Sequence, residues 1–158
     1  MSIFVKYFLV FIVSMVPLFE LRYTMVTLVP ALGVNYVIAL IIGIIGNMVP
    51  VPIIYLFARK VLEWGKDKKV IGNFFTWCLN KGERGGKKLE EKAGKGLYWA
   101  LFLFVGIPLP GTGAWTGTLA ASMLKLDFKK TVFAVMAGVV FAGLIMMAIS
   151  FGLFEVIF

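Results

Sequence analysis

The sequence contains no histidine and a single cysteine, Cys78. A lone cysteine cannot form an internal disulfide, and without histidine it has no usual co-ligand for a metal. No pair of acidic residues suggests a paired-carboxylate catalytic site, and the glycines match no nucleotide-binding loop that follows a strand. We therefore expect no enzyme, no metal and no other cofactor.

Charge is also scarce outside one segment. Residues 59–95 hold eleven of the 16 Lys and Arg and five of the 8 Asp and Glu, which leaves five basic and three acidic residues elsewhere. A net charge of +8 is also found in nucleic-acid-binding proteins, but here the basic residues form a loop between apolar halves, which membrane topology explains more simply. Lys and Arg near membrane spans stay in the cytoplasm and meet anionic headgroups there. We expect membrane lipids, not nucleic acid, as partners.

Apolar residues are abundant. They make up 61% of the chain, and the mean hydropathy is +0.96, whereas a soluble domain has roughly 45–50% apolar residues. Crossing ~30 Å of hydrocarbon takes about 20 helical residues, and residues 35–58 and 128–154 meet that length. The composition predicts an all-α integral membrane protein with two full transmembrane helices.

Two other apolar stretches are only half as long. Residues 97–107 and 114–124 have eleven residues each, about 16 Å as helix, and "PLPGTG" joins them. They predict a re-entrant hairpin over residues 97–124 that turns near the bilayer midplane, where irregular backbone must be buried in protein or line a wet cavity. A single kinked span is the alternative, since proline is tolerated in membrane helices.

The first half of the chain has the same layout. A shift of 91 positions places "VPLFELRYTMVTL" on "IPLPGTGAWTGTL", so that Pro17 matches Pro108 and Thr27 matches Thr118. The predicted fold is an inverted repeat in which each half is a re-entrant hairpin followed by one transmembrane helix. Its parts are the first repeat at 1–58 (hairpin 3–32, helix 35–58), the segment 59–95, and the second repeat at 96–158 (hairpin 97–124, helix 128–154).

The charge distribution also predicts the orientation. With residues 59–95 in the cytoplasm, both termini are external, and Lys125, Lys129 and Lys130 fall on the cytoplasmic side as well. Residues 61–94 mix apolar and basic side chains, which predicts an amphipathic element on the inner leaflet. A solvated linker is the alternative, and the Gly-rich residues 81–96 favour a flexible connection.

Glu20 and Arg22 are the only charged residues between Lys6 and Arg59, and they lie at the break of the first hairpin. An ion in hydrocarbon costs several kcal/mol, about 2.5–3.5 even on insertion scales, so such residues generally face a partner or a watery cavity. Glu20 could carry a proton, and the planar fork of Arg22 suits a phosphate or carboxylate. The alternative is that both side chains lie nearer the interface and extend to water.

The second break offers no charge but a helix N-terminus near Gly113, whose free amides attract anions. If the two breaks meet, Arg22 and this N-terminus would form an electropositive pocket beside Glu20. Threonines there could instead bond back to their own helix, and Asn47 could line a pathway or bond to a neighbouring helix. The remaining candidate site residues are Pro17, Pro108, Pro110, Gly111, Thr112, Gly113, Trp115 and Thr116.

The segments "VPLFELRYTMV" and "FVGIPLPGTGAWTGTLAASML" resemble the two signatures of the small multidrug export protein family and, through it, of the DedA superfamily. The resemblance implies a protein of the cell inner (plasma) membrane with two opposed re-entrant hairpins and, for the superfamily, movement of lipids or lipid-linked phosphates that is often linked to protons. By position it assigns the first signature's charges to Glu20 and Arg22. The second signature falls on Pro108, Pro110, Gly111 and Gly113 and departs from DedA proteins proper, because it carries no further charge.

The leading hypothesis is therefore a transporter, acting as a homodimer or larger assembly, that moves an amphiphilic or anionic small molecule or lipid and uses Glu20 for proton coupling. One alternative is a small multidrug/proton antiporter that exports lipophilic cations, although the half-length arms and the long basic loop do not suit four short-looped spans. Another is a non-transporting membrane scaffold whose basic loop recruits partners.

Overall fold

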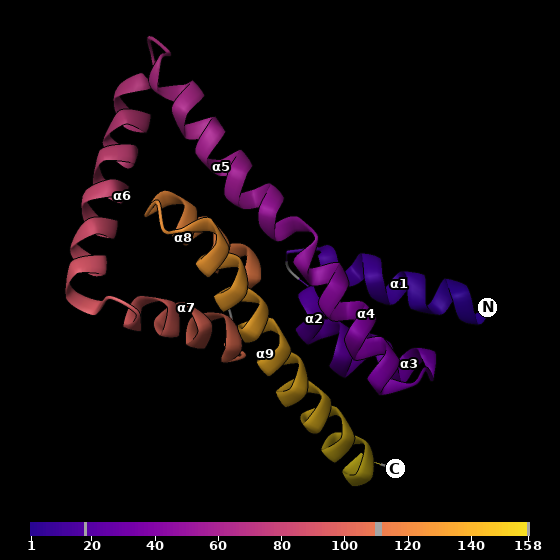
Figure 1. The fold of residues 1–158 in the computed structure, drawn as a ribbon. Helices are drawn as coiled ribbons and strands as arrows, with labels where there is room; N and C mark the ends of the chain where they lie inside the picture. Colours follow the sequence, from indigo (N-terminus) through magenta and orange to yellow (C-terminus); the bar gives the residue numbers. More distant parts are fainter. Residues whose placement is uncertain (18, 110–111, 158) are drawn as a thin grey trace.

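The computed structural model describes residues 1–17, 19–109 and 112–157, and these residues form helices and no strand. Figure 1 shows the arrangement of the helices. In chain order they are α1 (Ile3–Met15), α2 (Glu20–Tyr23), the π-helix η1 (Thr24–Leu28), α3 (Val29–Leu32), α4 (Tyr36–Met48), α5 (Pro50–Lys66), α6 (Gly72–Ala93), α7 (Gly96–Gly106), α8 (Ala114–Met123) and α9 (Phe128–Ile157).

Two helices are long and apolar enough to cross a membrane. The first is Tyr36–Lys66, in which α4 continues into α5, and the second is Phe128–Gly152 in α9. They contact each other near the centre of the molecule (Figure 1). The all-helical fold with two long apolar helices is as predicted and is consistent with a membrane protein. The inverted repeat and the re-entrant hairpins stay predictions.

The break that follows each short apolar helix begins at a residue that precedes a proline. Val16 leaves the helical region with ψ 132° before Pro17, and Ile107 does so with ψ 121° before Pro108. The proline ring disfavours helical backbone in the residue before it, so α1 ends after 13 residues and α7 after 11. Neither helix reaches the length needed to cross a bilayer.

The two long helices begin in the same way. Gly33 has a left-handed backbone (φ 60°), and two residues later the side chain of Asn35 accepts hydrogen bonds of 3.0 and 3.2 Å from amides in the first turn of α4. Lys125 is also left-handed (φ 53°), and two residues later Asp127 accepts a 2.9 Å bond from an amide in the first turn of α9. Left-handed residues end helices, and Asn and Asp begin them.

The helices of the two halves pack reciprocally. The helix before each break packs along the long helix of its own half, α1 on α4 and α7 on α9. The segment after each break also reaches the long helix of the other half, since α2 and η1 contact α9 and α8 contacts α5. Small residues permit this close packing: a Cβ at Gly138 would lie 2.8 Å from the Cβ of Val105.

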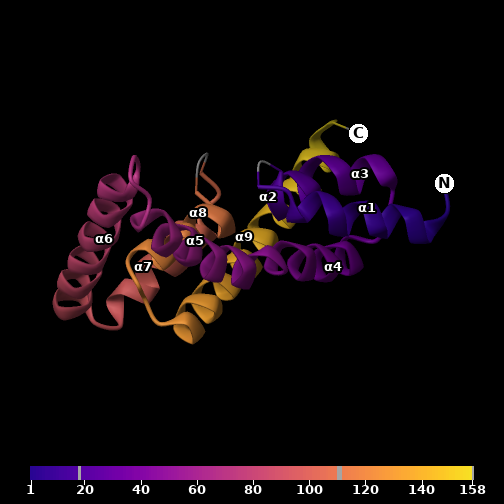
Figure 2. The same cartoon turned by 90° about the horizontal axis from the view of Figure 1, so that it is seen from above.

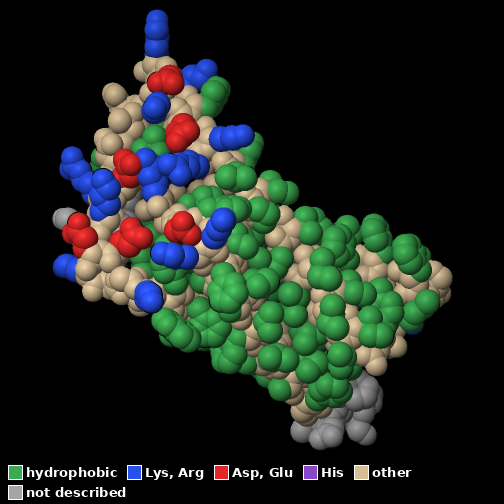
Figure 3. Space-filling model, viewed as in Figure 1, with side chains coloured by type: hydrophobic (Ala, Val, Ile, Leu, Met, Phe, Trp, Pro, Cys, Tyr) green, Lys and Arg blue, Asp and Glu red, His purple; other side chains and the backbone are tan. Residues whose placement is uncertain are grey.

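Helix α6 lies at the end of the molecule opposite α1 (Figure 2). On the face shown in Figure 3, the Lys, Arg, Asp and Glu side chains gather at this end, and hydrophobic side chains cover most of the remainder. The flexible connection expected at residues 81–96 is instead helical as far as Ala93. Glu83 lies one turn before Lys87 and pairs with Lys125, and both interactions favour the helix.

Candidate functional site

The Glu20 side chain of the first break reaches the helix that follows the second break. It is only 7% exposed, and the backbone amides of Ala114 and Trp115, at the N-terminus of α8, donate to its carboxylate. A helix N-terminus favours negative charge because free amides and the helix dipole point toward it. A Cβ at Gly113 would lie 2.6 Å from the Oε1 atom of Glu20, so a glycine there leaves room for the carboxylate.

The backbone of Glu20 is held in an uncommon conformation. Its φ is 47°, a left-handed value that non-glycine residues rarely adopt and that concentrates at functional sites. Its amide donates to the carbonyl of Val16 at 2.8 Å, and its carbonyl accepts from Thr24 Oγ1 at 2.8 Å. Ser14 Oγ donates to Thr24 Oγ1 at 3.1 Å. The surrounding bonds therefore fix the residue whose side chain enters the site.

Arg22 binds the other end of the second break. Its guanidinium donates to the carbonyl of Val105 at 2.7 Å, to the carbonyl of Leu109 at 3.0 Å, and to the carbonyl and hydroxyl oxygens of Thr112 at 2.7 and 3.1 Å. Val105 lies in the last turn of α7, where carbonyl groups lack partners within the helix and carry negative partial charge. Arg22 thus caps α7 and also holds Leu109 and Thr112, which follow that helix.

The two charged residues complement the two helix ends at the second break. The carboxylate of Glu20 meets the N-terminus of α8, and the guanidinium of Arg22 meets the C-terminus of α7. The breaks therefore meet, but the electropositive pocket expected at α8 already contains the carboxylate of Glu20. An incoming anion would have to displace it.

Other predicted residues support the breaks. Trp115 Nε1 donates to the carbonyl of Met15 at 3.1 Å and ties α8 to the end of α1. Thr112 Oγ1 donates to the Leu109 carbonyl at 2.8 Å, and Thr116 Oγ1 donates to the Gly113 carbonyl at 3.4 Å. Both hydroxyls therefore bond to their own segment, as the structural alternative predicted.

Two of the three predicted prolines lie among the described residues. Pro17 and Pro108 lie within the breaks, directly after the residues that end α1 and α7. Pro110 and Gly111, which were also predicted to belong to the site, lie outside the described residues. No role in binding follows from the positions of the two described prolines, which act on the backbone by ending helices.

Buried polar side chains surround the site, and the sequence indicated only some of them. Asn47 was predicted, and it is 3% exposed with its Oδ1 unpartnered among the described residues. Ser14 and Thr24 were missed, although each is a polar residue within an apolar run and is fully buried. Thr118 is fully buried too, and its hydroxyl has no partner in the part of the chain that the structure describes.

The site lies level with the middle of α9. Val105 packs on Gly138, and Leu21, next to Glu20, packs on Gly143. These glycines follow the first residue of α9, Phe128, by ten and fifteen positions, which is about 15 and 22 Å along a helix. In hydrocarbon ~30 Å thick, such a helix would hold the site near the midplane.

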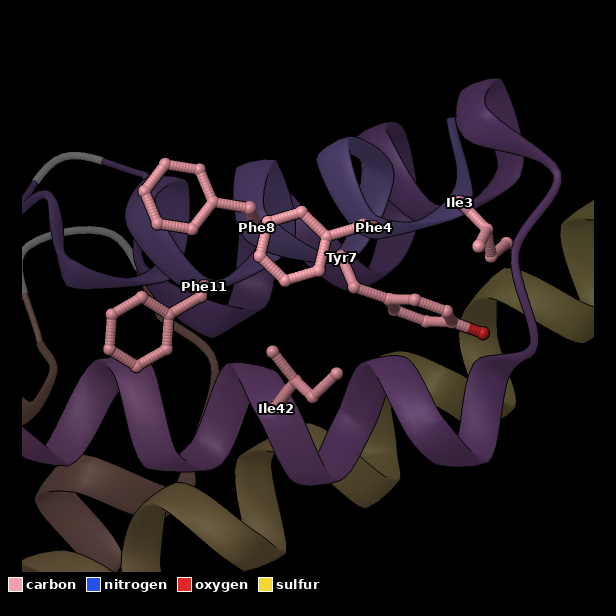
Figure 4. A pocket seen from close by; sticks show the side chains of 6 residues that line it. All are labelled: Ile3, Phe4, Tyr7, Phe8, Phe11 and Ile42. Atoms are coloured by element: carbon pink, nitrogen blue, oxygen red, sulfur yellow. The ribbon is translucent and has the colours of Figure 1, made fainter. Parts of the chain in front are cut away.

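A separate apolar groove lies between α1 and α4 (Figure 4). The side chains that line it are Ile3, Phe4, Tyr7, Phe8, Phe11 and Ile42. It contains neither Glu20 nor Arg22, so it does not belong to the charged site. Because its lining is apolar, the groove could hold a lipid chain or another apolar group.

Comparison with known proteins gives one match. A family model described as "Putative small multi-drug export protein" matches residues 20–145, a range that contains Glu20, Arg22 and the whole second break. No curated protein and no solved structure matches significantly.

Proposed function

Because the chain belongs to the family of small multi-drug export proteins, we propose that it is a membrane transporter and not an enzyme. Its cargo in this proposal is an amphiphilic or anionic small molecule or a lipid, with lipid-linked phosphates included, and its movement is coupled to protons. The observation that carries the proposal is the buried carboxylate of Glu20, which connects the two breaks beside the middle of α9.

Proton coupling follows from what holds Glu20 in place. The ionised carboxylate is attracted to the amides of Ala114 and Trp115 and to the charge of Arg22. A proton on Glu20 removes that charge, and the N-terminus of α8 then becomes available to an anionic group of the cargo. Arg22, whose guanidinium is bonded to the second break, adds positive charge beside that place. The cargo and the ionised Glu20 thus compete for one place.

We propose that the two halves form an inverted repeat with opposed re-entrant hairpins, as in many secondary transporters. Three repeated features support it: a break at a residue before proline, a left-handed residue two positions before a helix cap, and the reciprocal packing of the halves. In this proposal two copies assemble in the inner membrane, residues 59–95 are cytoplasmic and both termini are external. Rocking of one half against the other would expose the breaks alternately.

Single-cysteine labelling tests this topology. Cys78 is the only cysteine, so Leu97→Cys and Leu124→Cys in a Cys78→Ala background each give one reactive thiol. Re-entrant geometry predicts that a membrane-impermeant maleimide labels both positions from the cytoplasmic side. Labelling from opposite sides would support the kinked span and overturn the hairpin.

Flux into proteoliposomes tests the function. The purified protein would be given a pH gradient and, in separate experiments, a labelled isoprenoid phosphate, a labelled phospholipid and a lipophilic cation. We expect pH-dependent flux of an anionic or amphiphilic probe that is lost in Glu20→Gln. Glu63→Gln is the control, because Glu63 is an exposed carboxylate at the far end of α5 that pairs with Arg59. Equal flux in Glu20→Gln and in the unchanged protein would refute the proposal.

Export of lipophilic cations is a second candidate. Arg22 directs its donors to the carbonyl and hydroxyl oxygens of the second break, which leaves the Glu20 carboxylate as a possible counter-ion for a cation. Glu20-dependent flux of the cation alone would favour this antiporter over the anion or lipid carrier. Absence of flux for every probe, together with normal cell growth of Glu20→Gln and Arg22→Ala variants, would favour a scaffold.

A further inference from the structure

One face of α8 carries buried residues at a spacing of four. The amide of Ala114 donates to Glu20 at the start of the helix, and two turns later Ser122 Oγ donates to the Tyr55 carbonyl at 2.7 Å. Thr118 lies midway between these two fixed points and is fully buried. The same face of one short helix therefore leads from the carboxylate of Glu20 to α5.

The hydroxyl oxygen of Thr118, on this line, has no partner among the described residues. Helix α5, which carries Tyr55, packs on α8. Buried polar groups are nearly always hydrogen-bonded, and the exceptions call for an ordered water or a functional role.

The line ends among charged residues. The Tyr55 hydroxyl donates to the carbonyl of Leu126, and Tyr55 interacts electrostatically with Arg59, Asp127 and Tyr98. Asp127 is exposed directly before α9, and Lys125, two residues earlier, pairs with Glu83 of the charged helix α6. Water therefore reaches one end of the line, and Glu20, with Arg22 as its charged neighbour, forms the other.

We infer that Tyr55, Ser122 and Thr118 form a hydrated file of hydroxyls that carries protons between the charged end of the molecule and Glu20. This inference rests on the proposed function, because it supplies the proton that Glu20 exchanges. Thr118 and Ser122, four residues apart on α8, are separated by about 6 Å, so a bridging water belongs between their hydroxyls. Ser122 contacts Tyr55 at its carbonyl, and the Tyr55 hydroxyl bonds to Leu126 beyond the end of α8. Each oxygen accepts one proton and releases another, an O–H bond forms on Glu20, and the aqueous end loses one proton.

Thr118→Val tests the file, because it removes the hydroxyl and keeps the shape of the side chain. After a rapid pH step, we expect proton uptake by Thr118→Val proteoliposomes to be at least tenfold slower, with cargo binding at equilibrium unchanged. Thr118→Ser restores a hydroxyl and should restore the rate. Thr27→Val is the matched control, since Thr27 aligns with Thr118 in the sequence repeat but is exposed.

A merely structural role predicts the opposite pattern. Valine should then leave proton uptake and its slowing in deuterium oxide unchanged, since removing an unpaired buried hydroxyl does not destabilise the fold. Unchanged uptake in both Thr118→Val and Ser122→Ala, with uptake lost in Glu20→Gln, would overturn the file and leave the proposed function intact. If Glu20→Gln also leaves uptake unchanged, or the unmodified protein takes up no protons, the proposed function fails and the file fails with it.

Discussion

Replacing Gly113 with alanine tests the contact between the two breaks. The φ of Gly113 is 161°, an extended value that alanine adopts without strain, so the substitution acts through its Cβ alone. That atom would lie 2.6 Å from Oε1 and 2.8 Å from Cδ of Glu20, and the carboxylate must move away from the start of α8.

The magnitude follows from the bonds that are disturbed. Each hydrogen bond to a charged group contributes about 1.5–3 kcal/mol, and two amide donors hold the carboxylate. Replacing glycine also lowers the conformational entropy of the unfolded chain, which offsets about 0.4–1 kcal/mol of the lost stability. We therefore expect Gly113→Ala to lower the free energy of unfolding by about 2–5.5 kcal/mol, measured by denaturant titration in detergent micelles.

A double-mutant cycle separates this contact from other effects. Glu20→Ala removes the carboxylate, and in that background Gly113→Ala should be neutral or stabilise the protein by up to about 1 kcal/mol. The coupling free energy between the two substitutions should exceed about 1.5 kcal/mol. Additivity within about 0.5 kcal/mol would show that the carboxylate does not lie against Gly113.

Three further substitutions test neighbouring features. Arg22→Lys removes the planar guanidinium that bonds the second break, so the free energy of unfolding should fall by about 1–3 kcal/mol. An unchanged free energy of unfolding would contradict the capping role. Gly46→Ala places a Cβ against the backbone of α1 and should cost about 1–3 kcal/mol in the same titration, whereas Gly152→Ala meets open space and should not destabilise; equal stability of the two variants would contradict that packing. A hydrogen bond from Lys125, together with its charge, holds the pKa of Glu83 below its usual 4.5, so the contribution of this pair is full above that value and is lost as the pH falls through the lowered pKa. The protection factors of the α6 amides, the ratio of intrinsic to observed exchange rate at the same pH, should therefore fall at acid pH, and Glu83→Gln should abolish that fall; a fall that persists in Glu83→Gln would rule out this pair as its cause.

The sequence predicted the features that depend on local rules. The lengths of the apolar runs indicated two long helices, and the steric effect of proline on the preceding residue located both breaks. The isolated charges of Glu20 and Arg22 marked the site, because ions are costly within an apolar run. These signals need no knowledge of which segments meet.

The partners of those charges could not be predicted. Arg22 bonds to backbone oxygens more than 80 positions away, and a carbonyl leaves no mark on the sequence. Gly113 was predicted as a site residue, but the sequence does not reveal that its missing side chain leaves space for the carboxylate of Glu20. The persistence of α6 through a glycine-rich stretch depends in part on the pairing of Glu83 with Lys125, which also joins distant segments.

The π-helical segment Thr24–Leu28 sets the rotational register of everything that follows it in the first hairpin. A π-turn closes its hydrogen bond one residue later than an α-turn does, so η1 accommodates one residue more than a regular helix would. If the same five residues wound as an ordinary helix, Val29 would be rotated by about 100°. Val29 is now fully buried, and the rotation would turn it away from the core while Glu20 and Arg22 kept their places. Deleting one residue from Thr24–Leu28 would instead remove the need for the wide turn, so a shortening of the chain at this point would preserve the orientation of α3 relative to the charged site.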